Sequence, residues 1–320
     1  MILALMALIL IYIVFIQQYL YEKIWHKNLD IDINFSPTTI TQGEESYLHV
    51  HVANRKFLPL PWLYITLNLS NKIDNDHILF SVWMYQRIKR KILITAQPRG
   101  IYRIRSATAI SSNLLNTKTY EKHIQTFTEL TVLPKLLEDY QAPDLIYKDI
   151  DAMLLSTSLT NPDPFEFKGI REYLPTDPLK SINFKATAIT GELMVNMYTP
   201  TSSRNLDIIL DLSTHAPKEH TAQREHAISL AATLATHYIK TAANVGLYTN
   251  GRGTYTGGNI SIAKSSNPSH IGTILTALTH IDYNIYRTDP LTDYISNLTN
   301  PNTVHLIIYI EESEVKTRYV

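Results

Sequence analysis

The chain has 320 residues, and its 29 Lys and Arg balance 29 Asp and Glu, so its net charge does not favour a partner selected by overall charge. Hydrophobic residues make up 45% and charged residues 18%, which excludes a disordered chain and suffices for a folded core. The absence of cysteine excludes disulfides, a thiolate nucleophile and cysteine-ligated zinc or iron–sulfur centres.

The first segment is an unbroken apolar run over residues 1–16, and the first charged side chain is Glu22. At 1.5 Å per residue, the uncharged stretch covers roughly 30 Å, the thickness of a bilayer core. A cleaved signal peptide would have basic residues before the run and a small-residue cleavage site after it, and neither is found. The run therefore predicts a single membrane-spanning anchor over residues 1–21, with tyrosines and Trp25 in the interface. A buried core helix is the alternative.

The flanking charges predict the orientation of this anchor. No Lys or Arg precedes the run, whereas Lys23 and Lys27 follow it within a short juxtamembrane linker, residues 22–29. By the positive-inside rule, we expect a single-pass protein of the cell membrane, in contact with lipid through residues 1–21, with its soluble part in the cytoplasm.

Residues 30–135 have the pattern of short strands. Residues 47–52 and 63–69 alternate between polar and apolar side chains, as half-buried strands do. Further strand-like stretches cover residues 90–95, 100–109 and 128–133, and turn residues separate them. This spacing predicts a β-sandwich or a small barrel, and we expect the sandwich.

A charge asymmetry lies within this region. From Ile78 to Tyr120 there are eight Lys or Arg and no Asp or Glu. The densest group is Arg87, Lys89, Arg90 and Lys91. A solvated sheet face explains it most simply, and beneath a cytoplasmic leaflet it would form a membrane-surface patch. A nucleic-acid-binding surface lacks a stacking platform here, so we expect no nucleic-acid partner.

Residues 201–320 have the pattern of an α/β domain. The run at 206–211 is typical of a strand buried on both faces, and helical spacing follows from Ala227 to Ala242. Strands near 245–248 and 304–310 alternate with helical stretches at 269–281 and 291–298. This order predicts a sheet with parallel pairs and a functional crevice beyond the carboxyl ends of its strands.

The first strand of this domain ends in Asp211 and Ser213, which could direct a carboxylate and a hydroxyl at one hard cation, Mg²⁺ or Mn²⁺. This Asp-x-Ser pattern is similar to the start of a metal-ion-dependent adhesion site of von Willebrand factor A-like domains, although His215 replaces the last Ser. Further ligands would come from Glu311 and from one of Ser265, Ser266 or Ser269. Since an isolated Asp-x-Ser is also common in turns, a chain without any cofactor is the leading expectation.

The same loop raises an enzymatic alternative. A hydrolase could use Asp211, Ser213 and His215, but no G-x-S-x-G elbow surrounds the serine. We therefore expect no enzyme.

The connector at residues 136–200 contains the most specific motif. Read without any resemblance, residues 163–185 are a polar, proline-rich connector in which Arg171 pairs with Glu172 or Asp177. Residues 163–196 resemble the hallmark of the family called domain of unknown function 58, whose members show an E-F-x-G-x-R-x-Y pattern followed by P-G-D and I-D-W-K. The matching residues are Glu166, Phe167, Gly169, Arg171, Glu172, Tyr173, Pro175, Asp177, Ile182 and Lys185. Thr176, Asn183, Phe184 and Ile189 depart from the family pattern, which makes the chain a divergent member.

This resemblance implies a fold and a role. The fold would be a β-sandwich followed by a shortened von Willebrand A-like α/β domain. The role would be that of a membrane-anchored assembly module, an adaptor for a MoxR-type AAA+ ATPase. Glu166, Arg171, Tyr173, Asp177 and Lys185 would form the partner-docking surface.

Overall fold

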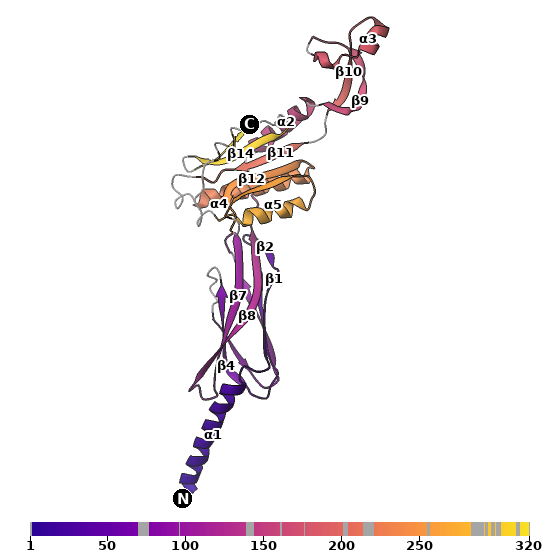
Figure 1. The fold of residues 1–320 in the computed structure, drawn as a ribbon. Helices are drawn as coiled ribbons and strands as arrows, with labels where there is room; N and C mark the ends of the chain where they lie inside the picture. The colour runs from indigo at the N-terminus through magenta and orange to yellow at the C-terminus, as the bar shows by residue number, and fades with distance from the viewer. Residues whose placement is uncertain are drawn as a thin grey trace. The chain divides into compact units, whose positions relative to one another are not determined.

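The chain folds as two units, Met1–Lys135 and Leu136–Val320 (Figure 1). The computed structural model describes residues 2–69, 77–95, 97–138, 144–160, 162–175, 177–200, 204–213, 221–254, 257–282, 291, 294–295, 298, 302–311 and 314–319.

The apolar N-terminal run forms helix α1 (Ile2–Ile24). Its last turns pack against the strands that follow, because Tyr21 and Trp25 are buried in the same core as those strands. The Tyr21 hydroxyl donates a hydrogen bond to the carbonyl oxygen of Pro59 at 2.6 Å, and the Trp25 ring stacks on Tyr120. These two aromatic residues therefore lie in the protein core rather than in the predicted interfacial belt.

None of the helices that the described residues form is both long enough and apolar enough to cross a membrane. The prediction of a membrane-spanning anchor over residues 1–21 is therefore not confirmed.

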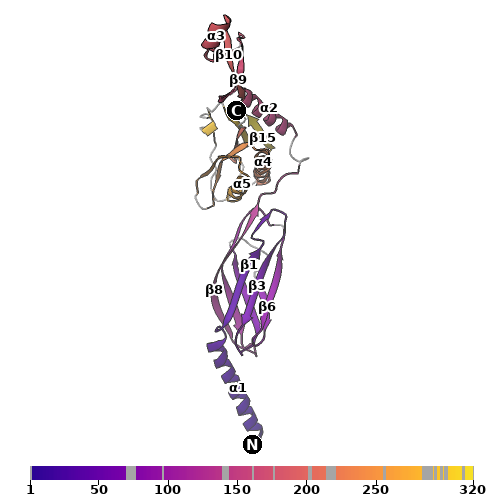
Figure 2. The same ribbon diagram turned by 90° about the vertical axis from the view of Figure 1, so that its right-hand side faces the viewer.

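Two sheets enclose one core in the first unit, and Figure 2 shows the smaller of them, with β8 beside it. The smaller sheet has the order β1-β3-β6, and the larger has the order β2-β8-β7-β4-β5. The strands are β1 (Leu29–Ser36), β2 (Thr39–Thr41), β3 (Ser46–Asn54), β4 (Leu60–Leu69), β5 (His77–Val82), β6 (Arg87–Ile94), β7 (Gly100–Ser112) and β8 (Thr119–Leu133). The prediction of a β-rich N-terminal region is confirmed.

The longest strand of this unit is β8. Near its beginning Tyr120 contacts α1, since its hydroxyl donates to the carbonyl oxygen of Gln18 at 3.2 Å. At its other end Thr131 and its neighbours pair with the short parallel strand β2, and the first unit ends two residues after Leu133. Along most of its length, β8 is hydrogen-bonded to β7 in antiparallel register.

A five-stranded sheet forms the centre of the second unit, in the order β13-β12-β11-β14-β15. Its strands are β11 (Asn205–Leu210), β12 (Asn244–Arg252), β13 (Asn259–Ser265), β14 (Val304–Glu311) and β15 (Glu314–Tyr319). Strand β11 is parallel to both β12 and β14, as predicted, because helical segments connect these strands. The outer strands β13 and β15 are antiparallel to their neighbours.

Three helices share one core with this sheet: α2 (Asp144–Thr160), α4 (Thr221–Lys240) and α5 (His270–Thr279). Alternate residues of β11, Leu206, Ile208 and Leu210, point into that core. Ile209 instead lies in a small cluster with Leu291 and Ile307. The prediction of a C-terminal α/β part is therefore confirmed.

The motif-bearing connector forms a separate two-stranded sheet. Strand β9 (Pro162–Glu172) pairs in antiparallel register with β10 (Met194–Pro200). Between these strands lie a 3₁₀ turn, η1 (Leu179–Ser181), and a short helix, α3 (Phe184–Thr190). We call residues 162–200 the hairpin unit.

Candidate functional site

The carboxyl end of β11 holds a compact polar network around Asp211. The Oδ1 atom of Asp211 accepts hydrogen bonds from the Ser213 backbone N–H at 2.9 Å and from the Ser213 hydroxyl at 2.7 Å. It also accepts one from the Asn250 side-chain amide at 2.6 Å. Asn250 lies near the end of the neighbouring strand β12 and is buried. Asn250 was missed in the sequence analysis, although its place near the end of a buried strand marks it as a candidate.

This network is poorly suited to a divalent cation. Three donors surround Asp211 Oδ1, and Oδ2 accepts the Leu291 N–H at 3.4 Å. A hard cation requires oxygens that are directed at it and not already bonded to donors. The Asn250 oxygen accepts the Leu212 N–H at 2.8 Å, which directs the amide nitrogen, and not the oxygen, at Asp211. These described residues therefore do not fit the predicted Mg²⁺ or Mn²⁺.

The other predicted ligands do not complete a metal site. Glu311 ends β14, which is parallel to β11, but its exposed carboxylate binds the Lys316 ammonium at 3.1 Å. Ser265 pairs with Val245 at the beginning of β12, because β13 runs antiparallel to β12. Ser265 therefore lies near the amino ends of β11 and β12, away from Asp211 at their carboxyl ends. Ser266 and Ser269, which follow Ser265 closely in the chain, lie on the same side. His215 lies outside the described residues.

Nor does the geometry of Ser213 favour a nucleophile. Its hydroxyl donates to a carboxylate oxygen that has two other donors, and the described residues supply no imidazole that hydrogen bonds with it. An activated serine needs such a base within hydrogen-bond reach.

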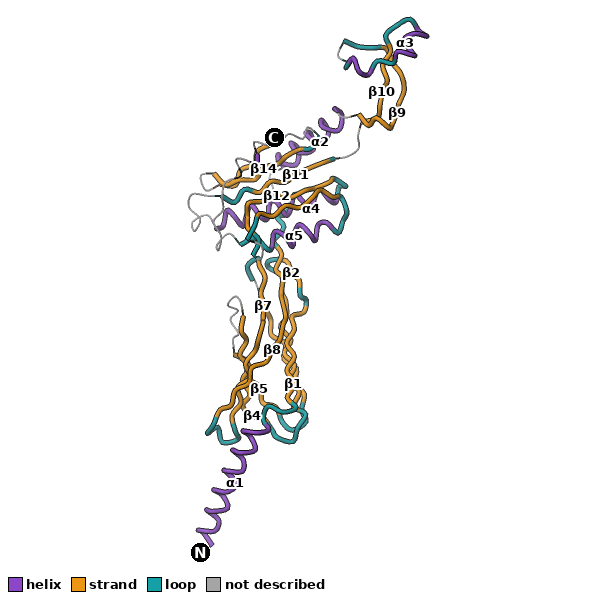
Figure 3. Tube along the Cα trace, in the orientation of Figure 1, coloured by secondary structure: helices purple, strands orange, loops and turns teal. Residues whose placement is uncertain are grey.

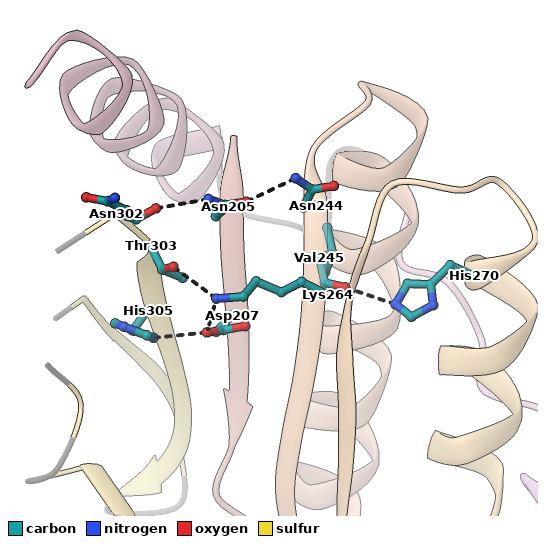
Figure 4. A network of polar contacts seen from close by, with 9 residues as sticks. All are labelled: Asn205, Asp207, Asn244, Val245, Lys264, His270, Asn302, Thr303 and His305. Carbon is teal, nitrogen blue, oxygen red and sulfur yellow. Dashed lines mark hydrogen bonds and ion pairs between the residues drawn. The ribbon is translucent and has the colours of Figure 1, made fainter. Parts of the chain in front are cut away.

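A second polar network lies nearer the amino ends of the same strands (Figure 4). The carboxylate of Asp207 on β11 binds the Lys264 ammonium of β13 at 3.1 Å. Lys264 also donates to the Thr303 hydroxyl at 2.9 Å. On β14 the buried His305 ring has its Nδ1 atom 3.4 Å from Asp207 Oδ2. The network therefore ties residues of three strands, and Thr303 beside β14, together across one face of the sheet.

Gly246 leaves room for this network. It lies opposite Asp207 in the β11–β12 pairing. A Cβ atom there would come within 2.4 Å of Asp207 Oδ1 and 3.0 Å of the Lys264 side chain. Close by, burial, together with the charges of Asp207 and Tyr248, raises the pKa of the Tyr294 phenol. The Tyr294 ring stacks on Tyr248 with centroids 3.7 Å apart. The side chains of the Asp207 network are therefore closely packed against Gly246.

A bidentate ion pair between Arg171 and Asp177 organises the hairpin unit. The two guanidinium nitrogens of Arg171 each donate to one Asp177 carboxylate oxygen at 2.6 Å. Asp177 also accepts the Leu174 N–H at 2.8 Å, which closes the turn after β9. The ion pair and this hydrogen bond lower the pKa of the Asp177 carboxyl, and the same pair raises the pKa of Arg171. Of the two partners foreseen for the Arg171 side chain, Asp177 provides the ion pair.

The other predicted docking residues lie on the same unit. The Tyr173 N–H donates to the Leu193 carbonyl at 2.8 Å, and Lys185 is exposed on α3. Glu166 belongs to β9, but its side chain lies outside the described part of the chain. Asn183, where the family has Asp, caps α3 by accepting the Ala186 N–H at 3.0 Å.

The hairpin unit exposes several large apolar side chains. Neither η1 nor α3 contains a buried residue. Phe184 and Ile189 on α3 are 77% and 78% exposed. The exposed large hydrophobic residues of this unit are Phe167, Ile170, Leu174, Leu179, Phe184, Ile189 and Leu193. A folded segment that exposes this much apolar surface is typical of an interaction site.

The predicted membrane-surface residues lie on β6, at one edge of the smaller sheet. Arg87, Lys89 and Lys91 are exposed, and the Lys91 ammonium lies 3.4 Å from the centroid of the Tyr47 ring. Arg90 is held in place by the backbone, because its guanidinium donates to the Leu79 carbonyl at 2.8 Å. The four cations thus share one edge strand, although the side chain of Arg90 is directed at the protein.

Comparison with known proteins identifies the domain that carries the motif. Residues 169–299 match the family model described as "Protein of unknown function DUF58", which confirms the resemblance over this range. No curated protein matches the chain.

Similarity to solved structures is limited. The CARDB domain of a Pyrococcus furiosus protein is 16% identical, with a TM-score of 0.26, over 33% of this chain and 94% of that one. Native E. coli alpha-2-macroglobulin is 16% identical, with a TM-score of 0.24, over 45% of this chain and 9% of that one. The sporulation control protein Spo0M of Bacillus subtilis is 12% identical, with a TM-score of 0.20, over 46% of this chain and 58% of that one.

Proposed function

Since residues 169–299 form a domain of the family of unknown function DUF58, we propose that this chain is a membrane-associated protein-interaction module whose hairpin unit binds a protein partner. The exposed apolar surface of that unit is the observation that carries the proposal. Protein interfaces bury such apolar side chains at their centre and surround them with charged residues. The Arg171–Asp177 pair holds the turn that presents Leu174 and Leu179, so it preorganises this surface.

The partner we propose is a MoxR-type AAA+ ATPase, for which the chain would act as an adaptor. This proposal extends the family resemblance of the motif at residues 163–196. It includes no catalytic activity and no nucleic-acid partner.

We also propose that the chain resides at the cell membrane, with its soluble part in the cytoplasm. The exposed apolar side chains of α1, from Leu5 to Ile16, support contact with lipid, and Lys23 and Lys27 after them support the orientation. At the level of the fold, we propose a β-sandwich followed by a shortened von Willebrand A-like domain. The shared core of the two N-terminal sheets and the parallel β11, β12 and β14 support that assignment.

The test is direct binding of the full chain, purified in detergent, to a purified MoxR-type ATPase. Phe184→Ser and Ile189→Ser should each weaken binding at least tenfold, because truncating a central apolar contact typically removes more than about 1.4 kcal/mol. Phe127→Ser is the matched control, since this residue of β8 is 71% exposed and lies outside the hairpin unit. Binding that survives both hairpin substitutions would overturn the proposed docking surface.

A further inference from the structure

The loops at one end of the first unit differ from those at the other end. Strands β3, β5 and β7 run toward α1, and the loops that follow them cover residues 55–59, 83–86 and 113–118. Figure 3 shows these loops, in teal, gathered beside the end of α1. We call them the α1-side loops.

Hydrogen bonds connect these loops to α1 and to one another. The side chain of Gln18 donates to the Thr117 hydroxyl at 3.3 Å, and that of Tyr21 donates to the Pro59 carbonyl at 2.6 Å. The Tyr85 N–H donates to the Lys56 carbonyl at 3.2 Å, which joins the remaining loop to the one at 55–59. Two of the three loops therefore contact the last turns of the helix, and the third is joined to one of these two.

Each of the α1-side loops exposes large apolar side chains. The residues are Phe57, Trp83, Met84, Tyr85, Leu114 and Leu115, with exposed fractions from 39% to 74%. At the opposite end, residues 37–45, which include the short strand β2, and the described loop residues 97–99 expose no large hydrophobic side chain. This difference between the two ends shows that the apolar loop tips are not a general property of the unit.

The helix that emerges among these loops is apolar on every side. Six consecutive residues, Leu8 to Ile13, are all more than half exposed. Because successive helical residues are separated by about 100°, six of them cover the whole circumference of the helix. A protein groove or a second copy would cover only one face of such a helix, whereas lipid would contact all of its faces.

We propose that the α1-side loops insert their tips into the interface of a lipid bilayer, so that the first unit rests on the membrane by this end. This inference rests on the proposed membrane association of α1. Trp and Tyr favour the interfacial region because their rings are apolar and their N–H or O–H groups remain hydrated, which suits Trp83 and Tyr85. Contact at three loops in addition to α1 would hold the unit at a fixed orientation on the bilayer.

The experiment measures the depth of Trp83 in vesicles. The chain contains three Trp, so Trp25→Phe with Trp62→Phe leaves Trp83 as the only reporter. In vesicles of phosphatidylcholine and phosphatidylglycerol with brominated acyl chains, Trp83 fluorescence should fall at least twofold relative to unbrominated vesicles. A matched control adds Trp83→Phe and Phe127→Trp, which moves the reporter to an exposed position of β8, and its fluorescence should not change.

Flotation of the same samples separates the two proposals. Chains that float with vesicles while Trp83 stays unquenched would overturn the loop insertion and leave the association of α1 intact. Chains that fail to float would overturn both.

Because Trp25 is buried and its substitution can disturb folding, hydrogen exchange of the unaltered chain provides a second measurement. Vesicles should slow exchange at residues 83–86 and 113–118 but not at residues 37–45, and equal rates with and without vesicles would overturn the insertion.

Discussion

The side-chain amide of Asn250 bridges the ends of two parallel strands, donating to Asp211 Oδ1 at 2.6 Å while accepting the Leu212 N–H at 2.8 Å. Both hydrogen bonds lie where a crevice would be expected in this kind of sheet. The amide therefore holds the loop after β11 in place and occupies one of the two carboxylate oxygens that a cation could use.

Replacing Asn250 should destabilise the second unit. Asn250→Ala leaves the Leu212 N–H without its acceptor and Asp211 without one of its donors, at a cost of about 1–3 kcal/mol in the free energy of unfolding. Urea unfolding followed by circular dichroism measures this cost. Asn259→Ala is the control, because Asn259 is an exposed residue at the beginning of β13. A cost below about 0.5 kcal/mol for Asn250→Ala would contradict this role.

Divalent cations should not stabilise the chain. Magnesium or manganese at 100 times a dissociation constant would add about 2.7 kcal/mol, a clear rise in melting temperature. We expect no rise, because the donors around Asp211 Oδ1 leave it unsuited to a cation. Asp211→Ala is measured in parallel. A rise in the unaltered chain that is absent from Asp211→Ala would restore the metal site.

A methyl group at Gly246 should disrupt the Asp207 network. Gly246→Ala places a Cβ atom against Asp207 and Lys264, and such overpacking typically costs about 1–3 kcal/mol. Thermal unfolding of the full chain reports the change. Gly272→Ala serves as the comparison, because a Cβ atom added to this helical glycine would meet nothing within 4 Å and should be neutral or slightly stabilising. Equal effects of the two substitutions would refute the steric argument.

The turn of the hairpin unit should open in acid. The pKa of Asp177 lies below the usual carboxyl range in the folded chain, so its ionised form stabilises the turn. That stabilisation is complete above the unfolded-state pKa of about 4 and is lost as the pH falls through the lower folded value. Hydrogen exchange of the Leu174 amide, corrected for its intrinsic pH dependence, should show protection at about pH 5 and loss well below about pH 4.

Asp177→Asn should remove this acid transition, whereas Glu172→Gln should retain it, since the exposed Glu172 side chain lies outside the Arg171–Asp177 pair. An identical acid transition in Asp177→Asn would assign it to another group.

Lys56 should make the first unit more stable at alkaline pH. Only 6% of this residue is exposed, and its Nζ atom has no hydrogen-bond partner among the described residues. Burial, with the charge of Lys122, lowers the pKa of Lys56 to about 8. Since the unfolded chain binds this proton up to a pH of about 10.4, stability should rise between about pH 8 and pH 10.

Lys56→Met should therefore stabilise the unit by about 1–3 kcal/mol at pH 7, and by less at pH 10. Lys89→Met, at an exposed position of β6, should change stability little at either pH. Destabilisation by Lys56→Met at neutral pH would show that the ammonium has a favourable partner.

The order of the elements could be predicted where burial leaves a clear pattern. The apolar run from Leu206 to Leu210 predicts a strand covered on both faces, and its alternate residues do enter two separate clusters. Helix α2 escaped prediction, although Ile146, Ile150 and Leu154 recur at a spacing of four residues and are buried. Polar and proline-rich residues around it made the whole segment resemble a connector.

The candidate site was harder to predict than the fold. Asp211 and Ser213 form a local pattern, but Asn250 is a single amide far away in sequence, and only the β11–β12 pairing brings it to Asp211. Its place at the end of a strand predicts that Ser265 lies near Asp211. The antiparallel direction of β13 places it instead near the amino ends of the neighbouring strands. Strand direction depends on long-range pairing, which local periodicity does not report.

The path of β8 has a mechanical consequence. One end of this strand is fastened to α1 through Tyr120, and the other end leads directly into the second unit. If α1 is held at a membrane, as we propose, a pull on the second unit would load β8 along its length. Its hydrogen bonds to β7 lie across that direction, so they would share the load and yield together rather than one after another. Under such a load, the first unit would transmit tension without unravelling from one end.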